Sequence, residues 1–210
     1  MKTRIGIIDY GMGNLHSVKN ALDFIGCDAF ISSDPAKLDS ASGLILPGVG
    51  AFPDAMSFLN SSGMAGYILE SAHKRPIMGI CLGMQLLFDT GFEFRECAGL
   101  GLIHGNIVKI DHKNVKIPHI GWNQLTFKRN SRLTRNLKND DQVYFVHSYK
   151  AIVQNAENLI AITDHGSPIT AIVENDNIFG CQFHPEKSSD VGLKILKNFK
   201  EICDADITGN

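Results

Sequence analysis

The stretch PIMGICLGMQLLFD, Pro76–Asp89, places a cysteine between two glycines where an apolar run becomes amphipathic. This order predicts a strand, a tight turn at Cys81 and a helix from Leu82 to Asp89, which together form a nucleophile elbow. Glycines suit such a turn because a Cβ would clash where the flanking chain packs closely. The turn would expose Cys81 at the carboxyl edge of a sheet, near a helix N-terminus whose partial positive charge favours a thiolate. The alternative is a cysteine that packs in the core as a small hydrophobe.

The rest of the first half alternates strand-like runs (RIGIID, AFI, GLILPG) with helical segments. One such segment runs from Asn14, a candidate cap, to Gly26, and a longer one is broken near Gly63. Short strand-like runs and Asn/Asp/Gly-rich turns fill the second half, before an amphipathic helix near the C-terminus. We therefore expect an α/β fold with an open, mostly parallel sheet flanked by helices and extra antiparallel strands in the second half. Residues 1–203 would form a single domain, and residues 204–210 a polar tail that frays.

The bulk composition limits the classes of function. A formal net charge of −2 argues against a nucleic-acid-binding protein, which would carry a basic stripe. No apolar run approaches the ~18 residues of a membrane span, and Asp9 interrupts the N-terminal run too early for a signal peptide. The five cysteines form no CxxC pair, and the eight histidines show no metal-ligand spacing. We expect no metal, no cofactor, no nucleic-acid or membrane partner, and reduced thiols in a cytoplasmic protein.

A second polar motif, QFHPEKS, contains His184 and Glu186 directly after a strand-like run. Residues two apart in an extended chain face the same way, and Pro185 restricts His184 to extended conformations. If this strand runs parallel to the one before Cys81, His184 would lie at the same edge as the thiol. It would then serve as the proton shuttle, oriented by Glu186. A single histidine on a strand is more often structural, but here it accompanies a cysteine elbow.

The run LPGVG contributes a third loop to the same edge. Pro47, Gly48 and Gly50 follow the GLIL run directly, where the loops of an open parallel sheet line a ligand crevice. Glycines there would let backbone N–H groups approach a ligand and form an oxyanion hole. A simple tight turn is the alternative. Gln85 comes one helical turn after Cys81, so its amide can share the face of the nucleophile.

The segments LPGVG, GICLGMQLL and FHPEKS, in this order and at these separations, resemble the class I glutamine amidotransferase family over essentially the whole chain. IPHIGWNQL and YFVHSY resemble, more narrowly, the glutaminase subunits of imidazole glycerol phosphate synthase, which act in histidine biosynthesis. The resemblance implies attack on the side-chain amide of glutamine, release of ammonia and hydrolysis of a γ-glutamyl thioester. The residues it implies are the catalytic Cys81, His184 and Glu186; the oxyanion residues Gly48, Val49 and Leu82; and the glutamine-pocket residues Gly50, Gln85, His147, Ser148 and Tyr149.

The resemblance also implies a partner, a (β/α)₈-barrel cyclase subunit that receives the ammonia within a heterodimer. That subunit makes imidazole glycerol phosphate and AICAR from the nucleotide PRFAR, and its loaded state would activate the glutaminase through the PGVG loop. The positions implied at the contact are Asn14, Trp122, Asn123, Tyr144 and Lys187. Without the resemblance, Trp122 and Tyr144 are as well explained as core aromatics and Lys187 as a solvated charge.

Three other functions fit the same motifs. The chain could be a paralogue that supplies ammonia to a different synthase, for example in surface-sugar biosynthesis. It could be a stand-alone Cys–His γ-glutamyl hydrolase, although the GWN and YFVHSY segments argue against this. A regulatory module that has lost catalysis is the third, and the occupied positions Cys81, His184 and Glu186 argue against it.

Overall fold

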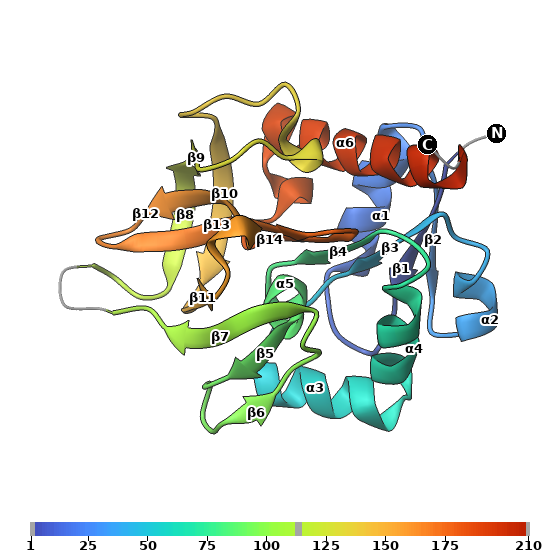
Figure 1. Cartoon of the computed structure of the whole chain (residues 1–210), viewed down its shortest axis with the longest axis horizontal. Helices are drawn as coiled ribbons and strands as arrows, with labels where there is room; N and C mark the ends of the chain where they lie inside the picture. The colour runs from blue at the N-terminus through green and yellow to red at the C-terminus, as the bar shows by residue number, and fades with distance from the viewer. Residues whose placement is uncertain (1–2, 112–114, 209–210) are drawn as a thin grey trace.

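An eight-stranded sheet forms the centre of the molecule, in a computed structural model that describes residues 3–111 and 115–208 (Figure 1). Its strands are β1 (Arg4–Ile8), β2 (Asp28–Ser32), β3 (Gly43–Leu46), β4 (Ile77–Ile80), β9 (Thr126–Phe127), β12 (Leu159–Asp164), β13 (Pro168–Asn175) and β14 (Ile178–Cys181). Their order is β2-β1-β3-β4-β14-β13-β12-β9. The pairs from β2 to β14 are parallel, and those from β14 to β9 are antiparallel. The expected α/β fold, with antiparallel strands contributed by the second half, is confirmed.

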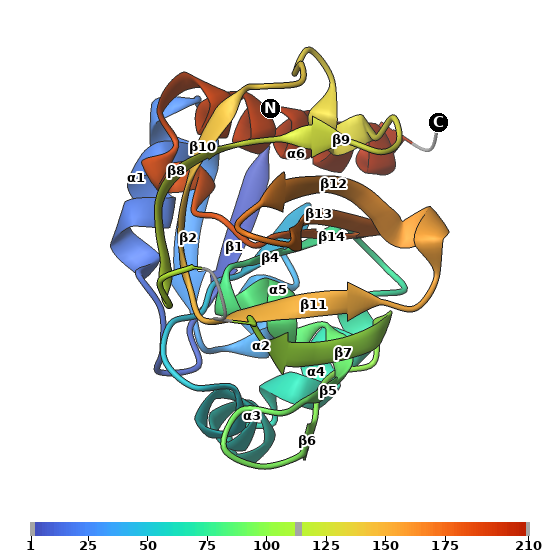
Figure 2. The same cartoon turned by 90° about the vertical axis from the view of Figure 1, so that its left-hand side faces the viewer.

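Two smaller sheets lie beside the central one. The first has the order β11-β7-β5-β6, and the second is a ribbon of β10 and β8. Figure 2 shows β11 and β7 crossing below the central sheet, with β8 and β10 at its left. Their bounds are β5 (Phe88–Gly91), β6 (Cys97–Ala98), β7 (Ile103–Lys109), β8 (His119–Gln124), β10 (Gln142–His147) and β11 (Tyr149–Val153).

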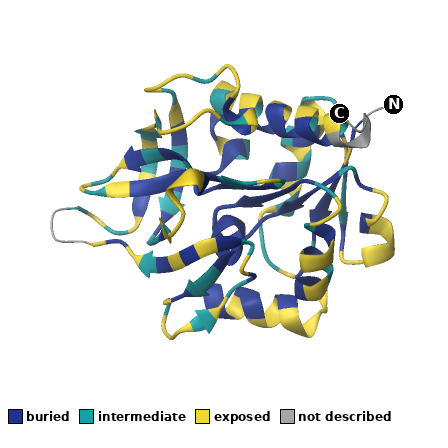
Figure 3. Cartoon of the chain, in the orientation of Figure 1, coloured by how far each residue is buried: buried dark blue, intermediate teal, exposed yellow. Residues whose placement is uncertain are grey.

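Helices cover both faces of the central sheet (Figure 1). They are α1 (Leu15–Phe24), α2 (Pro35–Leu38), α3 (Phe52–Ser61), α4 (Met64–Ser71), α5 (Leu82–Leu86) and α6 (Ser189–Thr208). Neighbouring side chains of a strand point to opposite faces, so Ile45 packs in one cluster with α1 and α6, and Leu44 and Leu46 in another with α3, α4 and α5. Figure 3 shows the buried central strands between these layers. None of the helices, within the described residues, is long and apolar enough to cross a membrane.

The helix after Cys81 is shorter than the sequence predicts. It ends at Leu86, and Phe88 already belongs to β5. Instead of continuing the helix, the carbonyl groups of Leu86 and Leu87 accept hydrogen bonds from the backbone of Leu100 and Leu102, at 2.9 and 2.8 Å. These tertiary bonds override the helical pattern of the sequence and turn the chain into the four-stranded sheet.

The boundaries of the other helices agree only in part with the sequence-based expectation. Asn14 stands at the N-cap of α1, but its side chain makes no capping hydrogen bond. Gly63, with φ of 75°, separates α3 from α4, which confirms the predicted break. The last helix continues to Thr208, and Asp204 accepts a hydrogen bond of 2.7 Å from the Thr3 hydroxyl. Residues 204–208 are therefore helical rather than a frayed tail, and 209–210 lie outside the described residues.

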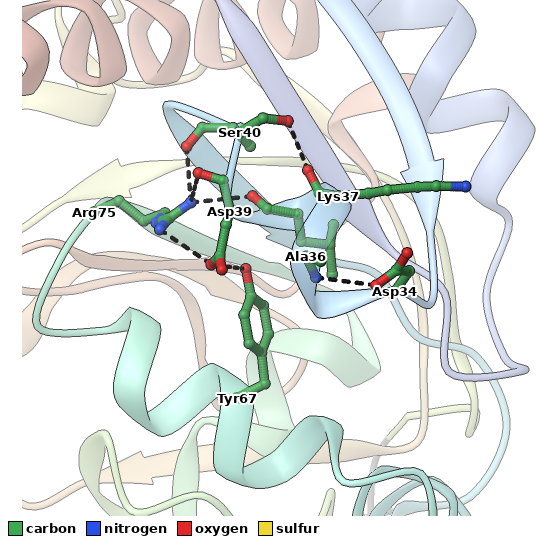
Figure 4. Close-up of polar contacts among 9 residues, drawn as sticks. Asp34, Ala36, Lys37, Asp39, Ser40, Tyr67 and Arg75 are labelled. Carbon is green, nitrogen blue, oxygen red and sulfur yellow. Dashed lines mark hydrogen bonds and ion pairs between the residues drawn. The ribbon is translucent and has the colours of Figure 1, made fainter.

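Arg75 fixes the chain that leads into β3 (Figure 4). Its Nη1 lies 3.0 Å from the backbone carbonyl oxygens of Leu38, Asp39 and Ala41. The Asp39 carboxylate also accepts a hydrogen bond of 3.1 Å from the hydroxyl of Tyr67 in α4. Guanidinium groups suit this role because they present several N–H donors in a fixed plane. The contacts tie the segment before β3 to α4 and to the segment before β4.

Gly83 allows the start of α5 to pack against the end of β3, and its replacement tests that contact. In Gly83→Ala the added Cβ would overlap the carbonyl oxygen of Leu46. Because this neighbour is backbone, we expect a loss of about 1–3 kcal/mol in the free energy of unfolding. Gly66→Ala, in α4, is the matched control, since an added Cβ meets nothing within 4 Å. Gly66→Ala should stabilise the protein by about 0.5–1 kcal/mol. Urea denaturation followed by circular dichroism measures the free energy of unfolding of both variants. Equal effects of the two substitutions would contradict the close contact assigned to Gly83.

Candidate active site

Cys81 occupies the turn between β4 and α5, as the sequence predicts. Its φ of 55° and ψ of −112° are strained for a residue other than glycine. The surrounding structure holds this conformation, because the Cys81 N–H donates to the Cys181 carbonyl at 2.8 Å and α5 packs closely on β3 at Gly83. The side chain is more enclosed than expected, with 7% of its surface exposed, but it lines a cavity at this edge of the sheet.

His184 reaches the same edge because β14 runs parallel to β4, with Cys181 opposite Ile80. Its Nδ1 lies 2.7 Å from Glu186 Oε1, and the two side chains are 4% and 1% exposed. The predicted pair is therefore present and His184 is extended as predicted, but the expectation that an extended chain places Glu186 beside it was wrong. Pro185–Lys187 forms a 3₁₀ turn rather than an extended chain, and this turn brings the Glu186 carboxylate back to the imidazole.

The environment of His184 favours its protonated form. Burial on its own would lower the pKa of the imidazole, but hydrogen bonds to Cys81 and Glu186 outweigh burial and raise the pKa to about 10. Because Nδ1 is engaged by Glu186, the other ring nitrogen is the one available to the sulfur. The ring can therefore hold a proton next to Cys81 at neutral pH and deliver it to a leaving group.

The cavity at this edge has a volume of about 340 Å³, a size that suits a small molecule. It gathers residues from four separate predicted segments of the sequence. The predicted site residues that line it are Val49, Gly50, Cys81, Leu82, Gln85, His147, Ser148, Tyr149 and His184.

Two predicted residues lie behind the cavity wall rather than in it. Glu186 is covered by His184, to which it is bonded. Gly48 packs against the elbow, where an added Cβ would lie 2.7 Å from Gly83 N and 2.9 Å from Tyr10 Oη. Its role is thus to permit a close approach of the PGVG segment to α5, and it carries Val49 into the cavity wall.

Gln85 is buried and its amide nitrogen is fully used. Its Nε2 donates to the Tyr149 carbonyl at 3.1 Å and to Gln182 Oε1 at 2.9 Å. The carbonyl oxygen is then the group that Gln85 can offer to a donor in the cavity. Gln182, which the sequence analysis did not single out, is fully buried, and its Nε2 lies 3.9 Å from Cys81 Sγ.

The sequence analysis also missed a carboxylate in the cavity wall. Glu93 follows β5, and its Oε2 accepts a hydrogen bond of 2.8 Å from the Phe52 N–H at the start of α3. Pro118 and Val146 are the other lining residues that were missed. Glu93 stands in a polar hairpin without a motif, so only the folded structure brings it to the cavity.

The residues predicted at a partner contact fall into two groups. Asn14, Trp122 and Lys187 are exposed. The ring centroids of Trp122 and Tyr144 lie 6.1 Å apart, with the two rings edge-on to each other. Asn123 instead turns inward, since its Nδ2 donates to the Asp164 carbonyl at 2.7 Å. Alternation along β8 places Trp122 on the outer face together with the exposed Ile120, which the sequence analysis missed.

A second, larger hollow lies away from these residues. It has a volume of about 810 Å³, but Arg129 and Arg132 in its wall already pair with Glu157 and Glu174. No cysteine or histidine lines it. Among the described residues, no cluster of His, Cys, Asp and Glu side chains is arranged to hold a metal ion. The cavity beside Cys81 is therefore the candidate active site.

Comparison with known proteins agrees with this geometry. Residues 6–202 match the family described as Glutamine amidotransferase class-I. The chain is 52% identical to "Imidazole glycerol phosphate synthase subunit HisH" of Caldanaerobacter subterraneus subsp. tengcongensis, over 94% of this chain and 98% of that protein. It is 47% identical to the protein of the same name from Wolinella succinogenes, over 94% and 99%. A chain in the solved structure of PurLQS from Thermotoga maritima shares the fold, with a TM-score of 0.76 and 21% identity over 96% and 99%.

The charge state of His184 is directly measurable. By ¹⁵N imidazole NMR, the ring should stay protonated at neutral pH and lose its proton only as the pH rises through about 10. Glu186→Gln should lower this pKa, because a neutral amide stabilises the imidazolium less than a carboxylate does. His147 is the internal control, since burial lowers its pKa to about 4 and keeps it neutral in the same spectra. A His184 titration near the ordinary value of about 6.5 would contradict the assigned interactions.

Proposed function

The chain belongs to the class I glutamine amidotransferases, among the glutaminase subunits of imidazole glycerol phosphate synthase, and from this premise we propose that Cys81 hydrolyses glutamine to glutamate and ammonia. The observation that carries the proposal is the cavity at which Cys81 meets the His184–Glu186 pair. An intact nucleophile and proton shuttle favour a working enzyme over a regulatory module that has lost catalysis.

In the first half-reaction the Cys81 sulfur attacks the amide carbon of glutamine. As the C–S bond forms, negative charge develops on the amide oxygen. The N–H of Leu82, at the start of α5, faces no intrahelical acceptor and can stabilise this charge. The N–H of Val49 would be the second donor. His184 gives its proton to the amide nitrogen, the C–N bond breaks, and ammonia leaves behind a γ-glutamyl thioester.

In the second half-reaction water attacks the thioester carbon. His184, now without its extra proton, accepts a proton from the water, and the C–S bond breaks to release glutamate and restore Cys81. Glu186 keeps the imidazole oriented through both steps by its 2.7 Å contact with Nδ1. The same ring thus acts as an acid and then as a base.

The cavity offers groups that match the rest of the glutamine molecule. The Glu93 carboxylate suits the α-ammonium group, because a carboxylate is an acceptor of opposite charge. The carbonyl oxygen of Gln85 can accept from an N–H of the substrate. Gly50, Ser148 and Tyr149 complete the wall. A volume of about 340 Å³ is enough for a small molecule such as glutamine.

We propose further that this subunit works in the cytoplasm as a heterodimer with a (β/α)₈-barrel cyclase, which uses the ammonia to convert PRFAR into imidazole glycerol phosphate and AICAR. The printed names of the relatives, which are subunits of that synthase, support this partner. Exposed Ile120 and Trp122 on β8 supply an apolar surface for it. The five cysteines are thiols rather than disulfides, as expected in a reducing compartment.

Removal of the nucleophile separates glutamine hydrolysis from synthesis. Cys81→Ala should abolish glutaminase activity in the complex, while synthesis from added ammonium salts continues because the cyclase performs that step. Cys97→Ala is the matched control, since Cys97 is partly exposed and does not line the cavity. Steady-state assays of glutamate and of the nucleotide product measure both reactions. Glutaminase activity that survives in Cys81→Ala would overturn the assignment.

Dependence on the partner distinguishes this function from a stand-alone hydrolase and from a paralogue of another synthase. The isolated chain should hydrolyse glutamine slowly, and the cyclase loaded with its nucleotide should raise the rate by about 5–150-fold, the usual range of allosteric coupling. Lys187→Ala should weaken this activation more than it changes the KM for glutamine, because Lys187 is exposed beside Glu186.

The control for Lys187 is Lys74→Ala. Lys74 is exposed just before β4, at the end of the sheet opposite to Cys81, so its loss should leave activation unchanged. Assays compare the chain alone, with cyclase, and with cyclase and nucleotide. Full activity of the isolated chain would exclude the proposed coupling and favour a stand-alone hydrolase.

A further inference from the structure

Two buried histidines that the hydrolytic steps do not use connect β8 to the cavity. His119 Nδ1 lies 3.0 Å from His147 Nε2, and His147 Nδ1 lies 2.8 Å from the Tyr149 carbonyl oxygen. At the other end, Asn123 Nδ2 lies 3.3 Å from His119 Nε2. These contacts form a continuous series from Asn123 to Tyr149, which we name the histidine relay.

The direction of every hydrogen bond in the histidine relay follows from its last member. A carbonyl oxygen only accepts, so His147 Nδ1 carries the hydrogen and its Nε2 is the acceptor of a neutral ring. His119 Nδ1 must therefore donate to it, which leaves His119 Nε2 to accept from Asn123. The Asn123 amide supplies this donor and uses its other N–H on the Asp164 carbonyl. Both rings are thus neutral Nδ1–H tautomers.

The surroundings of the two rings keep them neutral and in place. His119 is stacked between Phe145 and His165, with ring centroids 4.7 and 4.1 Å away and planes within 21°. Burial, with a smaller contribution from His147 and His165, lowers the pKa of His119 to about 3. Burial, aided by His165 and His184 and opposed by the Tyr149 bond, lowers the pKa of His147 to about 4. The relay therefore stays neutral at neutral pH.

The end of the relay touches the groups that make the active site. The Tyr149 carbonyl that accepts from His147 also accepts from Gln85 Nε2, at 3.1 Å. Three residues earlier in the chain, the Val146 carbonyl lies 3.9 Å from Cys81 Sγ. The segment from Val146 to Tyr149 thus contacts both the nucleophile and the pocket glutamine, and His147 is its anchor.

We propose that His119 is a positioning residue of the glutamine pocket: it fixes the tautomer and orientation of His147, and through Tyr149 it places Gln85 against the substrate. The proposal rests on the function proposed above for the same cavity. His119 itself touches no reacting atom and does not line the cavity. Its position on β8, next to the exposed Ile120, makes the pocket depend on the conformation of that strand.

The tautomers provide a test that is independent of activity. Long-range ¹H–¹⁵N spectra of the full chain distinguish an Nδ1–H ring from an Nε2–H ring. Both His119 and His147 should be Nδ1–H at neutral pH. In His119→Phe the ring volume remains, but His147 Nε2 loses its donor. An Nε2–H tautomer of His147 in the unaltered chain would overturn the proposal whatever the enzyme does, and this reading does not require that any variant folds.

Kinetics of the complex then test positioning. His119→Phe should raise the KM for glutamine about tenfold, because it leaves a buried acceptor unpaired, and should lower kcat less. His119→Asn keeps an N–H near the position of Nδ1 and should restore the KM to within about threefold. His165→Phe is the matched control: it keeps a ring stacked on His119 and removes the hydrogen bond with the Lys116 carbonyl, but leaves the donor of His147 Nε2 in place.

The outcomes separate the two proposals. An unchanged KM in His119→Phe, or an equal rise in His165→Phe, would show that ring packing rather than the relay matters and would overturn the positioning role. Nδ1–H tautomers in a chain whose complex with the loaded cyclase lacks glutaminase activity would support the relay geometry while refuting both the proposed function and the positioning role that rests on it. A raised KM in His119→Phe, rescued in His119→Asn, supports the proposal.

Discussion

The candidate active site depends on the hydrogen bond from Cys81 N–H to the Cys181 carbonyl, at 2.8 Å. It continues the parallel pairing of β4 and β14 to the point where both strands end. Cys81, the proposed nucleophile, follows one strand and His184 follows the other, so the contact between them depends on the register of the two strands. A shift of one residue would turn every side chain of β14 to the opposite face of the sheet. The proposed reaction would therefore rely on sheet pairing between segments far apart in sequence.

The sequence predicted the residues at strand ends better than those brought in by tertiary contacts. Cys81 and Gln85 were found because glycine spacing and helical spacing are local signals. The contact between His184 and Glu186 was also predicted, although a 3₁₀ turn rather than an extended chain produces it. Glu93 could not be found, because its hairpin forms only when hydrogen bonds from the segment around Leu100 end α5 early. A local sequence pattern does not show where a tertiary hydrogen bond replaces a helical one.

The two histidines that line the cavity, His147 and His184, show that burial alone does not decide the charge of an imidazole. His184 gains an acid partner and a thiol, which outweigh burial and raise its pKa to about 10. His147 is also buried, but its partners are a carbonyl group and a second imidazole, and its pKa falls to about 4. One cavity thus combines a cationic ring, the proposed proton shuttle, with a neutral ring that takes part in hydrogen bonds. Proton transfer is proposed for His184 and the orientation of the pocket for His147. Because these are different residues, a change in the charge of His184 need not disturb the hydrogen bonds that shape the pocket.

The positive φ at Cys81 also constrains how this chain can change over generations. Residues other than glycine pay about 1–3 kcal/mol for such a backbone conformation. A glycine would relieve the strain and remove the sulfur in the same step. Selection for thermal stability alone would therefore favour glycine at this position and give an inactive protein. Selection for activity instead keeps the cysteine and its strained backbone. The fully buried strand β4, which leads into the turn, and its buried neighbour β3 supply stability that offsets this strain.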